Sequence, residues 1–166
     1  MSFEALLHTM AALNDVHNTL LELAEQKKHV LIHNQVEHLT QIVTKENKLL
    51  KQIGALDQRR VEAIGAFMME KGYKPNPRVT VSDLTKIIFN VEDKKALVDK
   101  QKQLLATIRK LREINQINQQ LIEQSLAYIN YSLDLMTGPS EDDVIYQNPL
   151  QTSYGTKRPG LFDTKA

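Results

Sequence analysis

The stretch from residue 90 to residue 136 constrains the fold more than any other, because it contains neither Gly nor Pro. Its apolar residues recur mostly every three or four positions, which is the period of one helix face. The positions of this apolar stripe are Leu97, Leu104, Ile108, Leu111, Ile114, Ile117, Leu121, Ile122, Leu126, Ile129, Leu133 and Met136. The pattern predicts one helix of about 45 residues, roughly 68 Å long.

Both ends of this predicted helix carry signals. Asn90 is a favourable N-cap, and the carboxylate of Asp93 suits the positive end of the helix dipole. Gly138 followed by Pro139 is a stop signal. A helix of this length needs partner helices along it, from its own chain or from another.

Polar residues interrupt the apolar stripe in its middle. Gln101, Asn115, Asn118 and Ser125 fall at or beside stripe positions. Buried amides are costly unless they are hydrogen-bonded, and they can fix the register of packed helices. Two interpretations follow. Either the amides form a register-setting polar layer or simply face solvent, or they line a groove that pairs them with another helix.

Two more helices are predicted before this stretch, over residues 2–31 and about 34–71. Ser2 is the expected N-cap of the first helix. At the start of the second, Asn34 with Glu37 three residues later resembles a capping box. The chain therefore breaks near residues 32–34.

Two glycines lie inside the second predicted helix. Gly54 and Gly65 are eleven residues apart, close to three turns, so they share one face. Each costs about 1 kcal/mol relative to Ala, which the close approach of another helix would offset. Gly72 is expected to end this helix, and the prolines that follow prevent its continuation.

A stiff linker, residues 73–81, leads to a short predicted helix at 82–89 with Ser82 as its cap. The helix is very apolar, with Leu84, Ile87, Ile88 and Phe89 among its eight residues. It either plugs the end of the helical bundle or lines a binding groove.

The composition changes after residue 137. Residues 138–166 hold three of the six Gly and three of the five Pro, and they lack helical periodicity. This composition predicts a flexible tail that carries a short docking motif. The fold class is therefore all-α: an elongated antiparallel helical bundle or coiled coil, residues 1–137, of three long helices and one short helix. We expect the two N-terminal helices to pack along the 90–136 helix.

Composition excludes several function classes. With 21 basic and 20 acidic residues the net charge is +1, which gives no electrostatic footprint for nucleic acid. The absence of Cys excludes disulfides, thiolate zinc sites and a Cys nucleophile. No Gly-rich phosphate loop and no nucleophile elbow occurs. We predict a protein that is not an enzyme and needs no cofactor.

Neither the histidines nor the apolar runs indicate a metal site or a membrane span. His29 and His33 lie four apart and could share a helix face as zinc ligands do, but no further ligand is specified nearby. We predict no metal site. The N-terminus lacks the basic region and apolar core of a signal peptide, and no run approaches the 18 apolar residues of a membrane span. A soluble, cytoplasmic protein without membrane insertion is expected.

Three segments carry a family resemblance. Leu111-Arg-Glu-Ile-Asn-Gln-Ile-Asn-Gln-Gln-Leu-Ile-Glu-Gln-Ser-Leu resembles the Asn-rich C-terminal helix of FlgN-type flagellar export chaperones. Leu20-Leu-Glu-Leu-Ala-Glu-Gln and Glu46-Asn-Lys-Leu-Leu-Lys-Gln-Ile are similar to that family's N-terminal helices. The order of long helix, long helix, short segment, long helix and loose tail is similar too.

The resemblance implies a cytosolic type III export chaperone. Such a protein binds the C-terminal helical segment of flagellar hook-associated (hook–filament junction) proteins, prevents their premature assembly and delivers them to the cytoplasmic domain of the export gate. A long helix whose apolar stripe is broken by amides can accept another amphipathic helix. The expected client groove consists of Leu111, Asn115, Asn118, Leu121, Ile122, Ser125 and Ile129.

The resemblance also implies a tyrosine beyond the long helix that docks on the export gate. Tyr146, flanked by Val144 and Ile145, matches best, and Tyr154 is the alternative. A rival function is a self-assembling coiled-coil scaffold or adaptor, in which a second copy fills the same seam. The client-free chaperone could likewise form a homodimer through its vacant groove.

Overall fold

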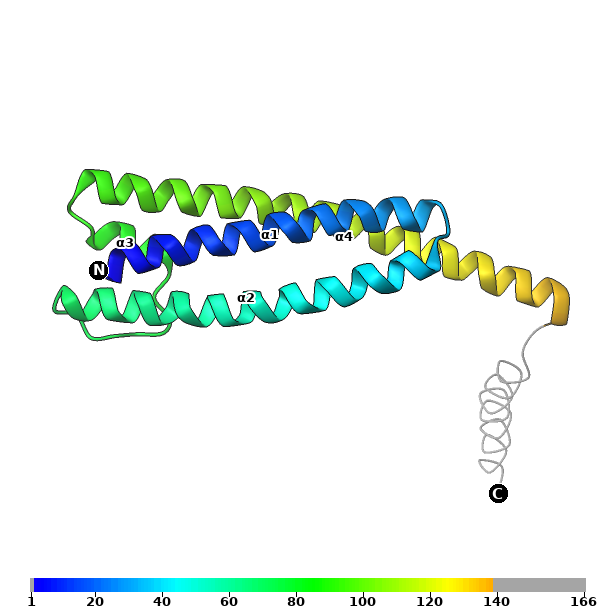
Figure 1. Ribbon diagram of the computed structural model, residues 1–166, viewed down its shortest axis with the longest axis horizontal. Coiled ribbons are helices and arrows are strands. Elements are labelled where there is room, and N and C mark those ends of the chain that lie inside the picture. The colour runs from blue at the N-terminus through cyan, green and yellow to red at the C-terminus, as the bar shows by residue number, and fades with distance from the viewer. Residues whose placement is uncertain (1, 139–166) are drawn as a thin grey trace, which may run out of the picture. The chain divides into compact units, whose positions relative to one another are not determined.

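Four helices make up the described part of the chain, residues 2–138 of the computed structural model (Figure 1). They are α1 (Ser2–Ile32), α2 (Val36–Glu70), α3 (Val81–Ile87) and α4 (Val91–Thr137). No strand occurs within residues 2–138, so the predicted all-α class is confirmed for them. The chain divides into two units, Met1–Ile122 and Glu123–Ala166, and α4 contributes residues to both.

Helices α1 and α2 run antiparallel and contact each other near both ends. The Ser2 hydroxyl donates to Glu70 Oε2 over 2.6 Å, and this hydrogen bond lowers the pKa of Glu70. At the other end, Lys27 Nζ forms an ion pair with Glu46 Oε2 at 3.1 Å. The prediction that Ser2 caps its own helix is wrong, because Ser2 is a helical residue whose hydroxyl bonds across to α2.

A left-handed residue separates α1 from α2. Asn34 has a φ of 54°, its N–H donates to the Leu31 carbonyl, and the Gln35 N–H donates to the Val30 carbonyl at 3.0 Å. This pair of bonds is the Schellman motif that ends a helix. The predicted capping box of Asn34 with Glu37 is therefore wrong, since Asn34 ends α1 and the actual cap residue makes no side-chain cap bond.

The glycines inside α2 do not meet another helix. A Cβ at Gly54 would have nothing within 4 Å, and one at Gly65 would meet only Pro75 Cβ, at 3.7 Å. The predicted helix contact on this face is wrong, because it faces open space and the linker. Gly72 does end α2, with a φ of 81° that favours glycine.

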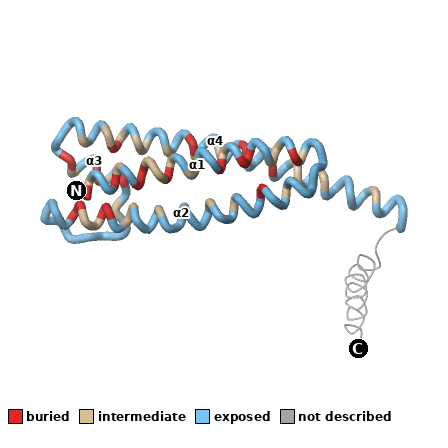
Figure 2. Tube along the Cα trace, in the orientation of Figure 1, coloured by how far each residue is buried: buried red, intermediate tan, exposed pale blue. Residues whose placement is uncertain are grey.

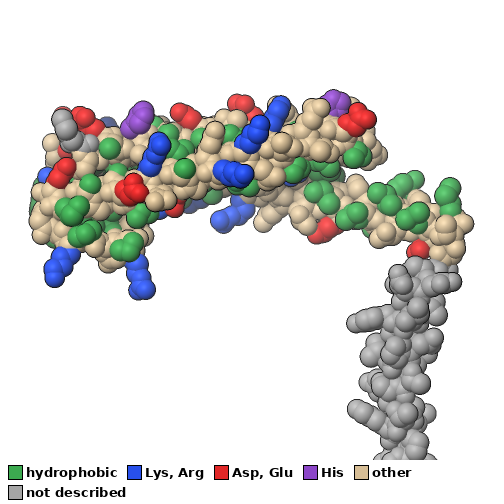
Figure 3. Space-filling view, turned by 60° about the horizontal axis from the view of Figure 1, so that its bottom comes forward, with side chains coloured by type: hydrophobic (Ala, Val, Ile, Leu, Met, Phe, Trp, Pro, Cys, Tyr) green, Lys and Arg blue, Asp and Glu red, His purple; other side chains and the backbone are tan. Residues whose placement is uncertain are grey.

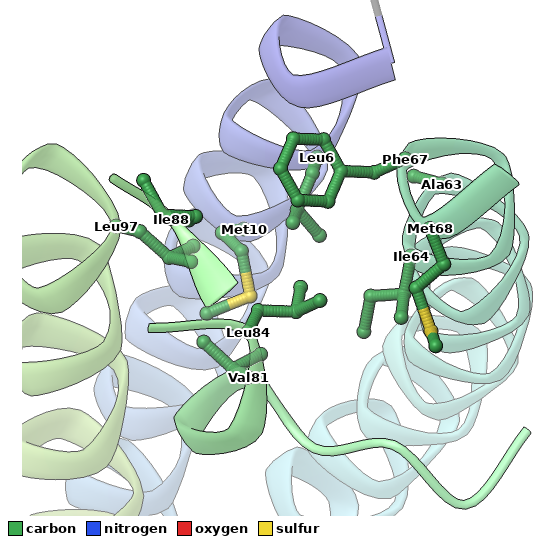
Figure 4. Packing of buried hydrophobic residues seen from close by; sticks show 10 residues of the cluster. All are labelled: Leu6, Met10, Ala63, Ile64, Phe67, Met68, Val81, Leu84, Ile88 and Leu97. Atoms are coloured by element: carbon green, nitrogen blue, oxygen red, sulfur yellow. The ribbon is translucent and has the colours of Figure 1, made fainter. Parts of the chain in front are cut away.

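The main hydrophobic core lies where α1, α2, α3 and the start of α4 meet (Figure 4). Figure 2 shows buried positions at this end of α1 and others farther along the helix. Its buried members are Leu6, Met10, Ala63, Ile64, Phe67, Met68, Val81, Leu84, Ile88 and Leu97. Through Leu84 and Ile88, the 82–89 segment packs into this core. This agrees with the first of its two interpretations, a plug at the end of the bundle. Phe89 does not take part, since it is 93% exposed.

Helix α3 is capped by Thr80. The Thr80 Oγ1 accepts the Asp83 N–H, and Asp83 Oδ2 accepts the Thr80 N–H at 3.0 Å, which is a complete capping box. The Thr80 hydrogen bonds hold the pKa of Asp83 below its ordinary value of 3.8. The predicted Ser82 cap is wrong, because Ser82 lies inside α3 and its Oγ accepts the Gln101 amide at 2.8 Å.

The capping box gives a first testable expectation. Thr80→Val removes the cap hydroxyl and should lower the free energy of unfolding by about 1 kcal/mol, as measured by urea denaturation. Thr85→Val is the matched control, because the Thr85 hydroxyl only bonds back to the Ser82 carbonyl. A lowered carboxylate pKa stabilises the fold above the unfolded pKa, so the Thr80 effect should shrink as the pH falls below about 4. Equal losses in both variants would contradict this role.

Helix α4 starts as predicted, with Asn90 Oδ1 accepting the Glu92 N–H at 2.9 Å. Its buried positions are Leu97, Thr107, Ile114 and Asn118. The later stripe positions Leu126, Ile129, Leu133 and Met136 are between 51% and 86% exposed. These stripe positions at the end of α4 are exposed, and Figure 3 shows apolar side chains at the surface of this part of the helix.

Candidate functional groove

Polar contacts join α4 to α1 with both helices running in the same direction. The Thr107 hydroxyl lies 2.9 Å from Asn14 Oδ1 and 3.3 Å from Asn18 Oδ1. Because a hydroxyl has one proton, it donates to one of these amide oxygens at a time. Further along, Asn118 Nδ2 donates to the Ala24 carbonyl at 2.9 Å. Both contacts fix the register of α4 on α1.

Asn118 is only 2% exposed, and it is incompletely satisfied. Its Oδ1 has no hydrogen-bond partner among the described residues. An unpaired buried acceptor costs about 1–3 kcal/mol. Of the polar residues that interrupt the apolar stripe, Asn118 therefore fits the first interpretation, a register-setting layer. Asn115, three residues earlier, is exposed.

Three hollows follow one another along α4 within the first unit. Hollow A, of about 250 Å³, has walls from α1, α2 and α4: Leu20, Lys27, Glu46, Leu50, Leu111, Asn115, Asn118, Gln119 and Ile122. Hollow B, of about 350 Å³, lies nearer the main core and includes Met10, Leu13, His17, Ile53, Asp57, Arg60, Val81, Gln101, Leu104, Leu105 and Ile108.

Hollow C, of about 400 Å³, lies between the other two along α4 and is lined by α4 alone. It shares Leu111, Asn115 and Gln119 with hollow A and Ile108 with hollow B. We call the three hollows together the α4 groove. Apolar side chains line it between amides, and the Lys27–Glu46 ion pair borders hollow A. Such a surface suits an amphipathic helix.

Other kinds of site find no support among the described residues. No group of three or more potential metal-ligating side chains occurs within residues 2–138. The His29 and His33 rings stack with their centroids 4.1 Å apart. No helix in the described part of the chain is sufficiently long and apolar to span a membrane.

The comparison with protein families decides the identity. The family model for the FlgN protein matches residues 1–153. The chain belongs to the FlgN family. This match confirms the resemblance to FlgN-type flagellar export chaperones that the sequence indicated.

The chain is also similar to an individual protein. The uncharacterized protein YvyG of Bacillus subtilis (strain 168) is 27% identical over 167 residues, which cover the whole of both chains. No solved structure matches the chain significantly.

The groove residues expected from the FlgN resemblance are only partly brought together. Leu111, Asn115, Asn118 and Ile122 line hollow A, whereas Leu121 is half-buried and does not. Ser125 and Ile129 lie beyond Ile122 in the second unit, where Ile129 is 51% exposed. The expected docking residues Val144, Ile145, Tyr146 and Tyr154 lie outside the described residues.

Sequence reasoning on this FlgN chain missed the opposite wall of the groove. Leu20 and Lys27 come from α1, and Glu46 and Leu50 come from α2. The two leucines stand out in the sequence as stripe residues, and both lie in segments that resemble FlgN helices. Nothing in the sequence tells which stripe residue meets which helix, so only packing could assign them to the groove.

Proposed function

We propose that this chain is a cytoplasmic type III export chaperone for flagellar hook-associated proteins. It binds the C-terminal helical segment of an unassembled hook–filament junction protein, prevents premature assembly and delivers the client to the export gate. The observation that carries this proposal is the α4 groove on a member of the FlgN family. An open groove with walls from several helices supports binding of one more helix.

The composition of the groove supports a helical client in particular. Leucines at its centre bury the apolar face of a helix, and the exposed amide of Asn115 at its rim can bond to polar groups beside that face. Every chemical step that the proposal needs is non-covalent.

Calorimetric titration tests the proposal. The full chain is titrated with a purified hook-associated protein, and with the same protein lacking its C-terminal helical segment. We expect saturable one-site binding to the first and none to the second. Equal binding of both, or binding of neither, would refute the proposal.

In this proposal, delivery of the client to the export gate depends on other residues than binding of the client. Tyr146 lies ten residues past Met136 in sequence, and an aromatic ring with a polar tip is a good docking anchor. Tyr146→Ala should weaken binding to the export-gate cytoplasmic domain about tenfold while client affinity and melting temperature stay unchanged. Tyr154→Ala is the matched control. If only the Tyr154 variant loses gate binding, the docking site belongs to the second tyrosine.

The exposed end of α4 favours one competing function, a self-assembling scaffold. Leu126, Leu133 and Met136 form a stripe that a second copy could cover. Sedimentation equilibrium of the client-free chain separates the two functions. A chaperone remains monomeric or forms a dimer that the client dissolves, whereas a scaffold forms an assembly that persists in the presence of client.

A further inference from the structure

Hollow B is the part of the α4 groove whose walls come from all four helices. Met10 and Val81 belong both to this hollow and to the main core (Figure 4). A concave site with mostly apolar walls and a few polar groups is the usual form of a ligand site, and the polar groups set its specificity. The residues of hollow B that can carry a charge are His17, Asp57 and Arg60.

Arg60 is the charged group of hollow B that keeps unused hydrogen-bond donors. Its Nε donates to Asp57 Oδ1 at 2.8 Å, but a guanidinium has five N–H groups. The other four have no partner among the described residues. His17 already donates its Nδ1 proton to the Leu13 carbonyl over 2.7 Å. A ligand in hollow B therefore meets the free edge of the Arg60 guanidinium.

The two ion pairs that border the α4 groove differ in burial. At hollow A, the side chains of Lys27 and Glu46 are nearly equally buried, so their charges offset each other. At hollow B, the Arg60 side chain is 23% exposed and the Asp57 side chain is 55% exposed. Water screens the more exposed charge more strongly. Hollow B therefore presents a net positive group beside an apolar surface, and hollow A does not.

The complement of this surface is a carboxylate carried on an apolar body. The planar fork of an arginine binds a carboxylate through two parallel hydrogen bonds. We propose that hollow B binds such a carboxylate through Arg60, and that its source is an Asp or Glu side chain of the helix docked in the α4 groove. The inference rests on the proposed function for the docked helix. It goes beyond that function in giving the helix an acidic residue and in making Arg60 the residue that selects it.

A small probe tests the chemistry of hollow B without any client. Octanoate is the probe, and octanol is its uncharged counterpart. Both are titrated by NMR into the full chain carrying carbon-13 in its methionine methyl groups, because Met10 lines the hollow, whereas Met69 does not. We expect octanoate to shift the Met10 signal saturably. Arg60→Gln should weaken octanoate binding at least about fivefold and should leave octanol binding unchanged.

Arg59→Gln is the matched control for this titration. Arg59 is the neighbouring residue on α2, is exposed and lines none of the three hollows. Its replacement should change octanoate binding less than about twofold. A Met10 signal that octanoate does not move, or equal losses in the Arg59 and Arg60 variants, would overturn the carboxylate site.

Calorimetry with a purified hook-associated protein tests the source of the carboxylate. Arg60→Gln should weaken binding about tenfold at about 50 mM salt, and the loss should shrink at about 500 mM, where charges are screened. Asp57→Asn removes the carboxylate that competes for Arg60 and should tighten binding about threefold. An exposed ion pair one helical turn apart contributes little to the fold, so the melting temperatures of both variants should stay at the wild-type value.

A charge exchange then identifies the acidic residue. Arg60→Glu is titrated with hook-associated proteins in which each Asp or Glu of the C-terminal helical segment is replaced by Lys, one at a time. One of these replacements should restore at least about fivefold of the lost affinity. Restoration by none of them would overturn the docked helix as the source of the carboxylate.

The remaining outcomes separate this inference from the proposed function. Wild-type client affinity in the Arg60→Gln variant would overturn the inference and leave the proposed function standing. A client-free dimer that Arg60→Gln dissociates would place an acidic residue of a second copy on Arg60 and would also overturn it. No binding of the client by the wild-type chain would refute the proposed function, and the docked helix as the source with it.

Discussion

Replacing Leu111 with Asp is expected to weaken client binding by a factor of about 100 or more. Leu111 lines two of the three hollows, so its side chain sits at the centre of the α4 groove. A docked helix would bury the new carboxylate without a partner, which costs about 3–5 kcal/mol. Calorimetry with a hook-associated protein measures the loss directly.

A control on the same helix shows whether the effect comes from the position of the new charge or from the charge alone. Gln120 is exposed and lines none of the hollows, so Gln120→Asp adds the same charge outside the groove and should bind like wild type.

Leu111 is half-buried, and the melting temperature shows whether its variant stays folded. If it does not, Asn115→Arg on the exposed rim tests the same groove. Wild-type affinity in a folded Leu111→Asp or Asn115→Arg variant would place the client elsewhere.

Replacing Leu97 with Ala is expected to lower the free energy of unfolding by about 3 kcal/mol. Leu97 is fully buried, and it is the α4 residue of the main core. Its truncation leaves a cavity that the plug formed by Leu84 and Ile88 cannot fill without moving. Because a domain is stable by only about 5–15 kcal/mol, this is a large fraction of the total.

Urea denaturation followed by circular dichroism measures this loss. Leu105→Ala on the same helix is the matched control, since Leu105 is 42% exposed and its truncation should cost less than about 1 kcal/mol. Equal costs at the two positions would mean that α4 is not anchored through Leu97. The folded Leu97 variant should retain client binding, because Leu97 does not line the groove.

Local signals predicted the helices well where they act within a few residues. The stop at Gly72, the N-cap at Asn90 and the length of α4 without Gly or Pro depend on backbone conformation and neighbouring side chains. The cap of α3 was also present in the sequence, because Thr80 and Asp83 have the spacing of a capping box. Ser82 was a plausible cap only because its bond to Gln101 is not visible in the sequence.

The two amides of the polar belt show the limit of sequence reasoning about the site. Asn115 and Asn118 are three residues apart on one helix face, and the pattern treats them alike. In the fold Asn118 is buried against the Ala24 carbonyl, while Asn115 is exposed at the rim of the groove. The difference comes from the path of α1, which the sequence of α4 does not contain.

The sequence by itself determined the all-α class, the long helix and the membership of a chaperone family. Periodicity, caps and stop residues act on nearby residues of the chain, and a family match likewise depends on the sequence alone. Only the tertiary structure decided what covers each face. Leu97 and Leu133 belong to the same stripe, yet one is completely buried and the other is 52% exposed. A periodic pattern states which side chains share a face, but the neighbour on that face is brought there by contacts far apart in the chain.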